Sequence, residues 1–228
     1  MKFKKIICPC CHKEVDIPLG KYSTGFDFDY SILLNSTEEF FDLVDICPEC
    51  GYAMLFDNGA GEEMCEFVRS EQYRNILHDP DMEDGLKKWI LLAMLSELDE
   101  KFTEAGIEYT KAYDYLVLKG MSLDKNLLKK AAACFLAAVE EADNDANDNL
   151  TDSVNDDDHA DEAAEEYVPF TEAFLAVDCL RRAGDFETAS ALLEAISETF
   201  EGELTDRVIW KEKMWLDLRI EEKRILDI

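Results

Sequence analysis

Two patterns of apolar and polar residues divide the chain. Over residues 1–57, short apolar runs alternate with turn residues, which is typical of β-strands, and the runs cover 3–7, 15–19, 40–46 and 52–56. From about residue 61 onward, apolar residues recur at the spacing of an amphipathic helix. The pattern predicts a mostly α protein, with a small β domain over 1–57 and a helical domain over 61–228.

The helical domain is predicted to contain seven helices. The first covers 62–77 and is ended by Asp79-Pro80, and the others cover 86–98, 101–118, 123–142, 167–183, 185–200 and 204–225. Between them, residues 143–166 carry eleven acidic residues and no Lys or Arg. Such a composition favours a solvated chain over a packed one, so we predict a flexible acidic loop at 143–166.

Two of the predicted helical hairpins fit the tetratricopeptide pattern of small and aromatic residues. The first match comprises Trp89, Leu92, Ala93, Ala105, Tyr109 and Ala112. The second runs from 173 to 196 and contains the turn Gly184-Asp185-Phe186, followed by Ala189. We therefore expect a tetratricopeptide-like domain, whose concave face would bind a peptide. The alternative is an irregular helical bundle with chance matches.

The strongest chemical signal is a pair of Cys-Pro-x-Cys turns. Two thiolates three residues apart in a tight turn can face one metal ion, and the proline fixes that turn. Two such turns supply the four sulfurs of a closed tetrahedral site, which is typical of structural zinc. We therefore predict a zinc-ribbon-like domain with rubredoxin-like knuckles, in which Zn²⁺ is bound by Cys8, Cys11, Cys47 and Cys50.

Several alternatives to this site remain open at the level of sequence. Cys10 and His12 adjoin the first turn and could compete as ligands. Four sulfurs also hold a single iron ion, as in rubredoxin, which would make the protein an electron-transfer module with a helical docking domain. The simplest alternative is four buried thiols without any metal. The remaining cysteines, Cys65, Cys134 and Cys179, lie among apolar neighbours and are predicted to be buried structural thiols.

Charge narrows the choice of partners. The chain has 52 acidic and 23 basic residues, a net charge of −29. Nucleic acids and anionic membranes repel such a protein, so we predict neither as a partner and expect a basic protein or peptide instead. The N-terminus lacks the apolar segment of a signal peptide, and cysteines without a disulfide pattern suit a reducing compartment, so we predict a cytoplasmic location.

No catalytic motif is visible in the sequence. The chain lacks H-E-x-x-H, G-x-S-x-G and the phosphate-binding G-x-x-x-x-G-K pattern. We therefore expect a non-enzymatic adaptor or scaffold. A hydrolase or transferase whose site forms no sequence motif is the weaker alternative, and a convergent pocket of ionisable residues would favour it.

The order of these motifs resembles an uncharacterised bacterial family of unknown function. In that family an N-terminal CPxC…CPxCGYA metal-binding segment precedes helical repeats, and residues 6–11 and 46–53 carry the resemblance here. The resemblance implies a bacterial cytosolic protein with the same four cysteine ligands, and it implies no activity. Cys10 and the acidic insertion at 143–166 depart from the pattern of the family.

Overall fold

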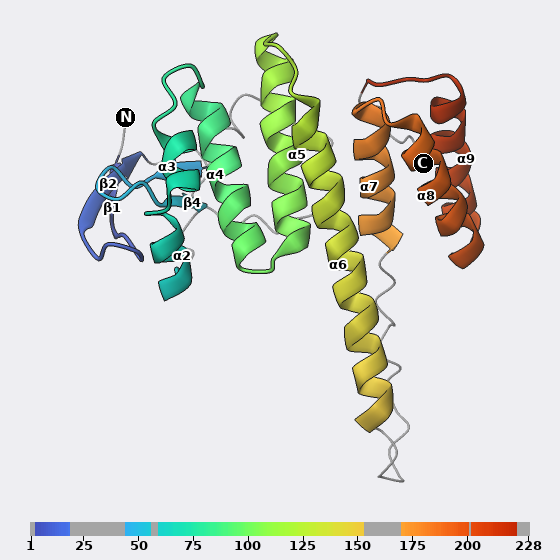
Figure 1. Ribbon diagram of the computed structural model, residues 1–228, viewed down its shortest axis with the longest axis horizontal. Coiled ribbons are helices and arrows are strands. Elements are labelled where there is room, and N and C mark those ends of the chain that lie inside the picture. Colours follow the sequence, from blue (N-terminus) through green and yellow to red (C-terminus); the bar gives the residue numbers. More distant parts are fainter. Residues whose placement is uncertain (1–2, 19–43, 56–58, 153–169, 201, 223–228) are drawn as a thin grey trace. The chain divides into compact units, whose positions relative to one another are not determined.

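The computed structural model describes residues 3–18, 44–55, 59–152, 170–200 and 202–222 (Figure 1). This part of the chain is mostly helical, with eight helices and two small two-stranded sheets. The chain forms two compact units, Met1–Leu127 and Leu128–Ile228. The predicted division at 57–61 therefore falls inside the first unit.

Each small sheet is an antiparallel hairpin. Strand β1 (Phe3–Ile7) pairs with β2 (Glu14–Pro18), and strand β3 (Val44–Ile46) pairs with β4 (Ala53–Leu55). The four strands confirm the apolar runs predicted from the sequence, although residues 19, 40–43 and 56 lie outside the described residues. Each hairpin has one cysteine turn at its tip: residues 8–11 form the first turn and residues 47–50 the second.

Four helices complete the first unit: α2 (Glu62–Phe67), α3 (Glu71–Leu77), α4 (Asp84–Leu98) and α5 (Phe102–Lys119). The prediction of one helix over 62–77 is wrong, because the chain leaves the helix after Phe67 and begins a new one at Glu71. Ser70 has extended backbone and its hydroxyl accepts a hydrogen bond from the Tyr73 N–H, which caps the start of α3. Helices α4 and α5 form the predicted hairpin.

The helix α6 (Lys125–Asp152) begins at the end of the first unit and continues into the second. The helix extends ten residues beyond its predicted end at 142 and covers 143–152. The sequence predicts these residues in the flexible acidic loop, so that part of the prediction is wrong. An alanine-rich helix extends readily once it has formed, because propagation costs far less than nucleation. The rest of the expected loop, 153–166, lies outside the described residues.

The second unit also contains α7 (Phe170–Arg182), α8 (Phe186–Thr199) and α9 (Glu203–Asp217). Helix α9 is shorter than predicted, because Arg219 adopts a positive φ and the Ile220 N–H bonds back to the Trp215 carbonyl. The fully buried Arg181 on α7 donates a hydrogen bond to Glu212 on α9 and so links these two helices. No helix among the described residues combines the length and the apolar character needed to cross a membrane.

Candidate metal centre

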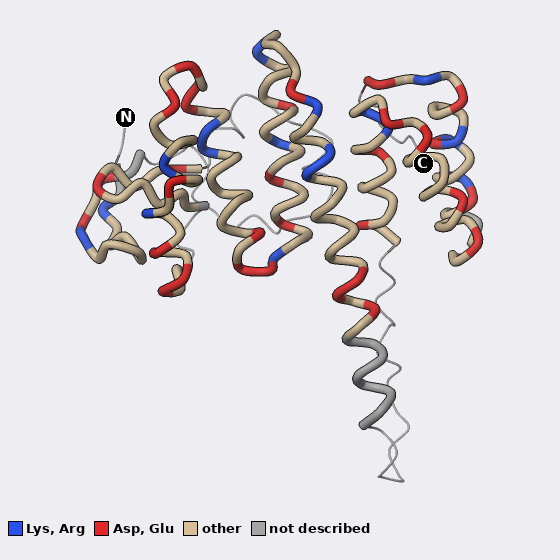
Figure 2. Tube along the Cα trace, viewed as in Figure 1, with Lys and Arg blue, Asp and Glu red and all other residues tan. Residues whose placement is uncertain are grey.

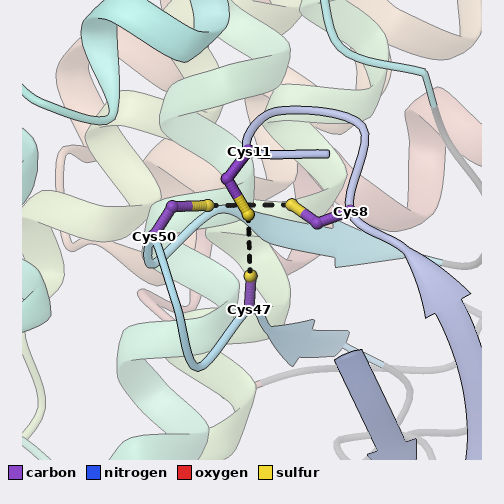
Figure 3. A group of neighbouring side chains, drawn as sticks. All are labelled: Cys8, Cys11, Cys47 and Cys50. Carbon is purple, nitrogen blue, oxygen red and sulfur yellow. Dashed lines mark hydrogen bonds between the residues drawn. The ribbon is translucent and has the colours of Figure 1, made fainter. Parts of the chain in front are cut away.

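The two cysteine turns bring four thiols together between the hairpins. The Sγ atoms of Cys8, Cys11, Cys47 and Cys50 all lie within 4.8 Å of one another (Figure 3). Cys8 Sγ is 3.7 Å from Cys50 Sγ, and Cys11 Sγ is 3.8 Å from Cys47 Sγ. A tetrahedral zinc site with Zn–S bonds of about 2.3 Å has sulfur–sulfur edges of about 3.8 Å. Two of the six sulfur–sulfur edges match this value, and none of the six exceeds 4.8 Å.

The two turns repeat the same backbone geometry. In the first, the Cys8 N–H bonds to the Lys13 carbonyl and the His12 N–H bonds to the Cys8 carbonyl, both at 2.9 Å. In the second turn, the Cys47 N–H bonds to the Tyr52 carbonyl and the Gly51 N–H bonds to the Cys47 carbonyl, also at 2.9 Å. His12 and Gly51 occupy equivalent positions, and both have a positive φ, of 57° and 84°. His12 thus serves as the bend of the first turn and lies outside the group of four ligands.

Backbone N–H groups are aimed at the sulfurs. Cys8 Sγ accepts from the N–H groups of Cys10 and Cys11, and Cys50 Sγ accepts from that of Tyr52. Such bonds favour the thiolate, which is the form that binds a metal. Burial acts in the opposite direction and raises the pKa of both Cys8 and Cys50. A bound cation would offset that burial, because it supplies the positive charge that the thiolates lack.

Cys11 differs from the other ligands because it lies nearer to solvent. Its slight burial would raise its pKa, but hydrogen bonds from the Lys13 N–H and from the neighbouring thiols outweigh burial and lower the pKa. At the surface, Lys13 Nζ pairs with Glu49 Oε2 at 2.5 Å. That ion pair links the first turn to the second beside the sulfurs.

Helix α3 holds the second turn in place. The buried Tyr73 hydroxyl donates to the Gly51 carbonyl at 2.9 Å and accepts from the Ala53 N–H at 3.0 Å. Arg74 Nη1 donates to the Cys50 carbonyl at 3.3 Å. A Cβ atom at Gly51 would lie 2.4 Å from Leu77 Cδ2 and would have to displace that side chain, and the positive φ of 84° strains any larger residue at this position. The cysteine group is therefore anchored on the helices that follow it in the sequence.

No pattern in the sequence predicts this anchoring. Tyr73 and Arg74 lie more than twenty residues beyond the second turn, and no local pattern connects them to it. The ligands themselves were predictable because each Cys-Pro-x-Cys turn is local. The structure places all four predicted ligands in one group, and four cysteines in this arrangement could hold a metal ion.

The other cysteines lie outside this group. Cys10, an alternative ligand in the sequence analysis, is 7% exposed and lies outside the group of four. Burial, with a smaller contribution from the Cys65 thiol, raises the pKa of Cys10 to about 12. Cys134 and Cys179 are buried as predicted, whereas Cys65 is only half-buried and that prediction is wrong.

Compared with known proteins, the chain matches no family profile, no curated protein and no solved structure. The function of this chain is therefore inferred from the site and the helices around it.

Proposed function

We propose that the protein is a non-enzymatic adaptor, in which a structural zinc ion stabilises a tetratricopeptide-like helical protein that binds a basic peptide segment. The observation that carries the proposal is the group of four thiols, with sulfur–sulfur distances of 3.7 and 3.8 Å across the two turns. Four protein ligands leave no open position for a substrate, which is typical of structural zinc sites. The zinc ion would contribute to folding rather than to chemistry.

The surroundings of the thiols support a structural role. Tyr73 and Arg74 bind the backbone of the second turn, and Lys88 on α4 lies 3.9 Å from Asp45 on β3. A metal ion that fixes the two turns would therefore also fix the surface against which α3 and α4 pack. Small sheets of two strands are marginal by themselves, so such a site needs both the ion and the helices.

The packing of the two helical hairpins supports the repeat-like assignment. In the α4–α5 hairpin, Ala93, Ala105 and Ala112 are fully buried. In the α7–α8 hairpin, Ala176 and Ala189 are fully buried as well. Small residues at these positions let paired helices approach closely, as tetratricopeptide repeats require. Gly184, in the turn between α7 and α8, has a positive φ of 81°.

The expected charge of the partner follows from the charge of the protein. Residues 62–84, which include α2 and α3, carry eight acidic residues and two arginines. Figure 2 shows these acidic positions along α2 and the loop between α3 and α4. A partner segment rich in Lys and Arg would be attracted to this surface, and the attraction would weaken as salt is added.

Fluorescence anisotropy with two labelled helical peptides tests this proposal. One peptide carries Lys and the other Glu at the same polar positions, with identical apolar residues. We expect the Lys peptide to bind and to weaken at least tenfold between low and physiological salt, and the Glu peptide not to bind.

Matched variants locate the binding surface. Glu62→Gln, Glu63→Gln and Glu66→Gln together neutralise three exposed glutamates on α2, whereas Glu187→Gln, Glu194→Gln and Glu198→Gln neutralise three on α8. The first set should weaken binding of the Lys peptide more than the second. Equal binding of both peptides, or no effect of salt, would overturn the proposed partner class.

A further inference from the structure

Helix α9 in the second unit carries an exposed row of apolar side chains. Trp210 and Leu218 are each 65% exposed, and Met214, midway between them, is 37% exposed. Residues four apart lie on one face of a helix. Leu218 follows the last residue of α9 and keeps the helical spacing, because its N–H donates to the Met214 carbonyl at 3.1 Å. The three side chains therefore form one continuous apolar stripe.

The stripe takes no part in holding α9 within its unit. The other face of the helix does so: Val208 and Trp215 are buried there, and Glu212 accepts a hydrogen bond from Arg181 on α7. Large apolar side chains that adjoin one another on the surface of a folded protein are typical of a protein–protein contact. We therefore expect a second macromolecule to cover the stripe.

The charges beside the stripe favour a second copy of the same surface. Among the described residues of α9, the exposed charged side chains are two acidic and two basic: Asp206, Arg207, Lys213 and Asp217. The whole chain has 52 acidic and 23 basic residues, so this face lacks the acidic excess of the protein. A partner of uniform charge would meet like charges at this face, whereas a surface with both signs can complement itself.

We infer that two copies of the chain associate through α9, with the two helices antiparallel about a two-fold axis near Met214. The stripe is symmetric about Met214, so this crossing places Trp210 of each copy against Leu218 of the other. An antiparallel two-fold pair also brings the same flank of each helix together. Lys213 and Asp217 lie on one flank, so Lys213 of each copy is within reach of Asp217 of the other. The inference goes beyond the adaptor function and does not depend on the metal centre.

The length of the stripe sets the strength of the association. Three apolar side chains on one helix form a contact at the small end of the range for specific interfaces. Much of the gain from burying them is offset by the freedom that the two copies lose. We therefore expect a dimer with a Kd of about 1–100 μM, which exchanges with the monomer.

Sedimentation velocity of the full-length protein over a range of concentrations tests the inference. The wild type should shift from monomer to dimer as its concentration passes through the expected Kd. Trp210→Glu places a charge in the stripe and should weaken the dimer at least tenfold. Val117→Glu is the matched control, because Val117 is 53% exposed on α5 in the first unit, and it should dimerise as the wild type does. Circular dichroism of both variants checks that they remain folded.

Two charge reversals test the antiparallel arrangement. Lys213→Glu leaves both flank positions acidic, and Asp217→Lys leaves both basic, so each variant alone should dimerise at least tenfold more weakly than the wild type. When the two variants are mixed, every facing pair between unlike chains has opposite signs, and dimers should form again. Pairing within one helix cannot cause this recovery, because each chain keeps its own two like charges.

Three results would overturn the inference. The first is a wild type that stays monomeric at concentrations well above the expected Kd. The second is a folded Trp210→Glu protein that dimerises as tightly as the wild type. The third is a mixture of the two charge variants that stays monomeric while the wild type dimerises.

Discussion

Removing the hydroxyl of Tyr73 should weaken metal binding without touching any ligand. Tyr73→Phe removes the hydroxyl that pairs with both the Gly51 carbonyl and the Ala53 N–H. Because Tyr73 is fully buried, the phenylalanine ring will be buried as well. Each unsatisfied buried backbone group costs about 1–3 kcal/mol, so the pair costs at least about 2 kcal/mol. Because the turn and its metal fold together, that cost should raise the Kd for zinc by about 30-fold.

The assay is a competition titration of zinc against a chromophoric chelator, with circular dichroism as the check on folding. Tyr115→Phe is the matched control. Its hydroxyl donates to Glu83 Oε2 at 2.8 Å and belongs to α5, away from the turns. The control should change the zinc Kd by less than about threefold, since it removes a hydrogen bond of about 1 kcal/mol elsewhere in the unit. A Tyr73→Phe protein that binds zinc as tightly as the wild type would refute the proposed anchoring.

Three further predictions concern single side chains. Cys47→Ser should abolish stoichiometric zinc binding because it removes one of the four ligands. Cys134→Ser should retain zinc, and elemental analysis of the two purified variants measures the zinc content of each. Burial raises the pKa of Glu108 from 4.5 to about 8, so the folded carboxyl keeps a proton that the unfolded chain releases. Stability should therefore fall between pH 4.5 and 8 by up to about 1.4 kcal/mol per pH unit, and Glu108→Gln should flatten that slope in denaturant titrations. Arg181→Met leaves Glu212 buried without its cation and should destabilise α7 and α9 by about 3–5 kcal/mol. Hydrogen exchange of these helices measures the loss, and the exposed Arg207→Met should leave exchange unchanged.

The parts of the fold that the sequence predicts are those that depend on local patterns. The strands flanking each cysteine turn follow from short apolar runs, and the four-cysteine group follows from two Cys-Pro-x-Cys turns. The hairpins α4–α5 and α7–α8 follow from helical periodicity with a short break, such as the glycine at 184. In each case the deciding residues lie within a few positions of one another.

The parts that the sequence misses depend on a weak local signal or on distant contacts. The break before α3 depends on one capping residue, Ser70, inside an otherwise periodic segment. The extension of α6 to Asp152 goes against an acidic composition that is typical of loops. The contact of Tyr73 with Gly51 joins residues separated by two elements, β4 and α2. Tertiary packing decides these features, and a single sequence carries no local signal for them.

The central claim is that four cysteines hold one structural zinc ion. Metal analysis of protein purified without added metal, combined with a visible spectrum and X-ray absorption at the metal edge, tests it most directly. The account predicts one colourless zinc ion per chain, bound by four sulfurs at about 2.3 Å. One iron per chain with visible absorption would favour an electron-transfer protein over the proposed adaptor. Reduced protein that contains no metal would contradict the claim outright.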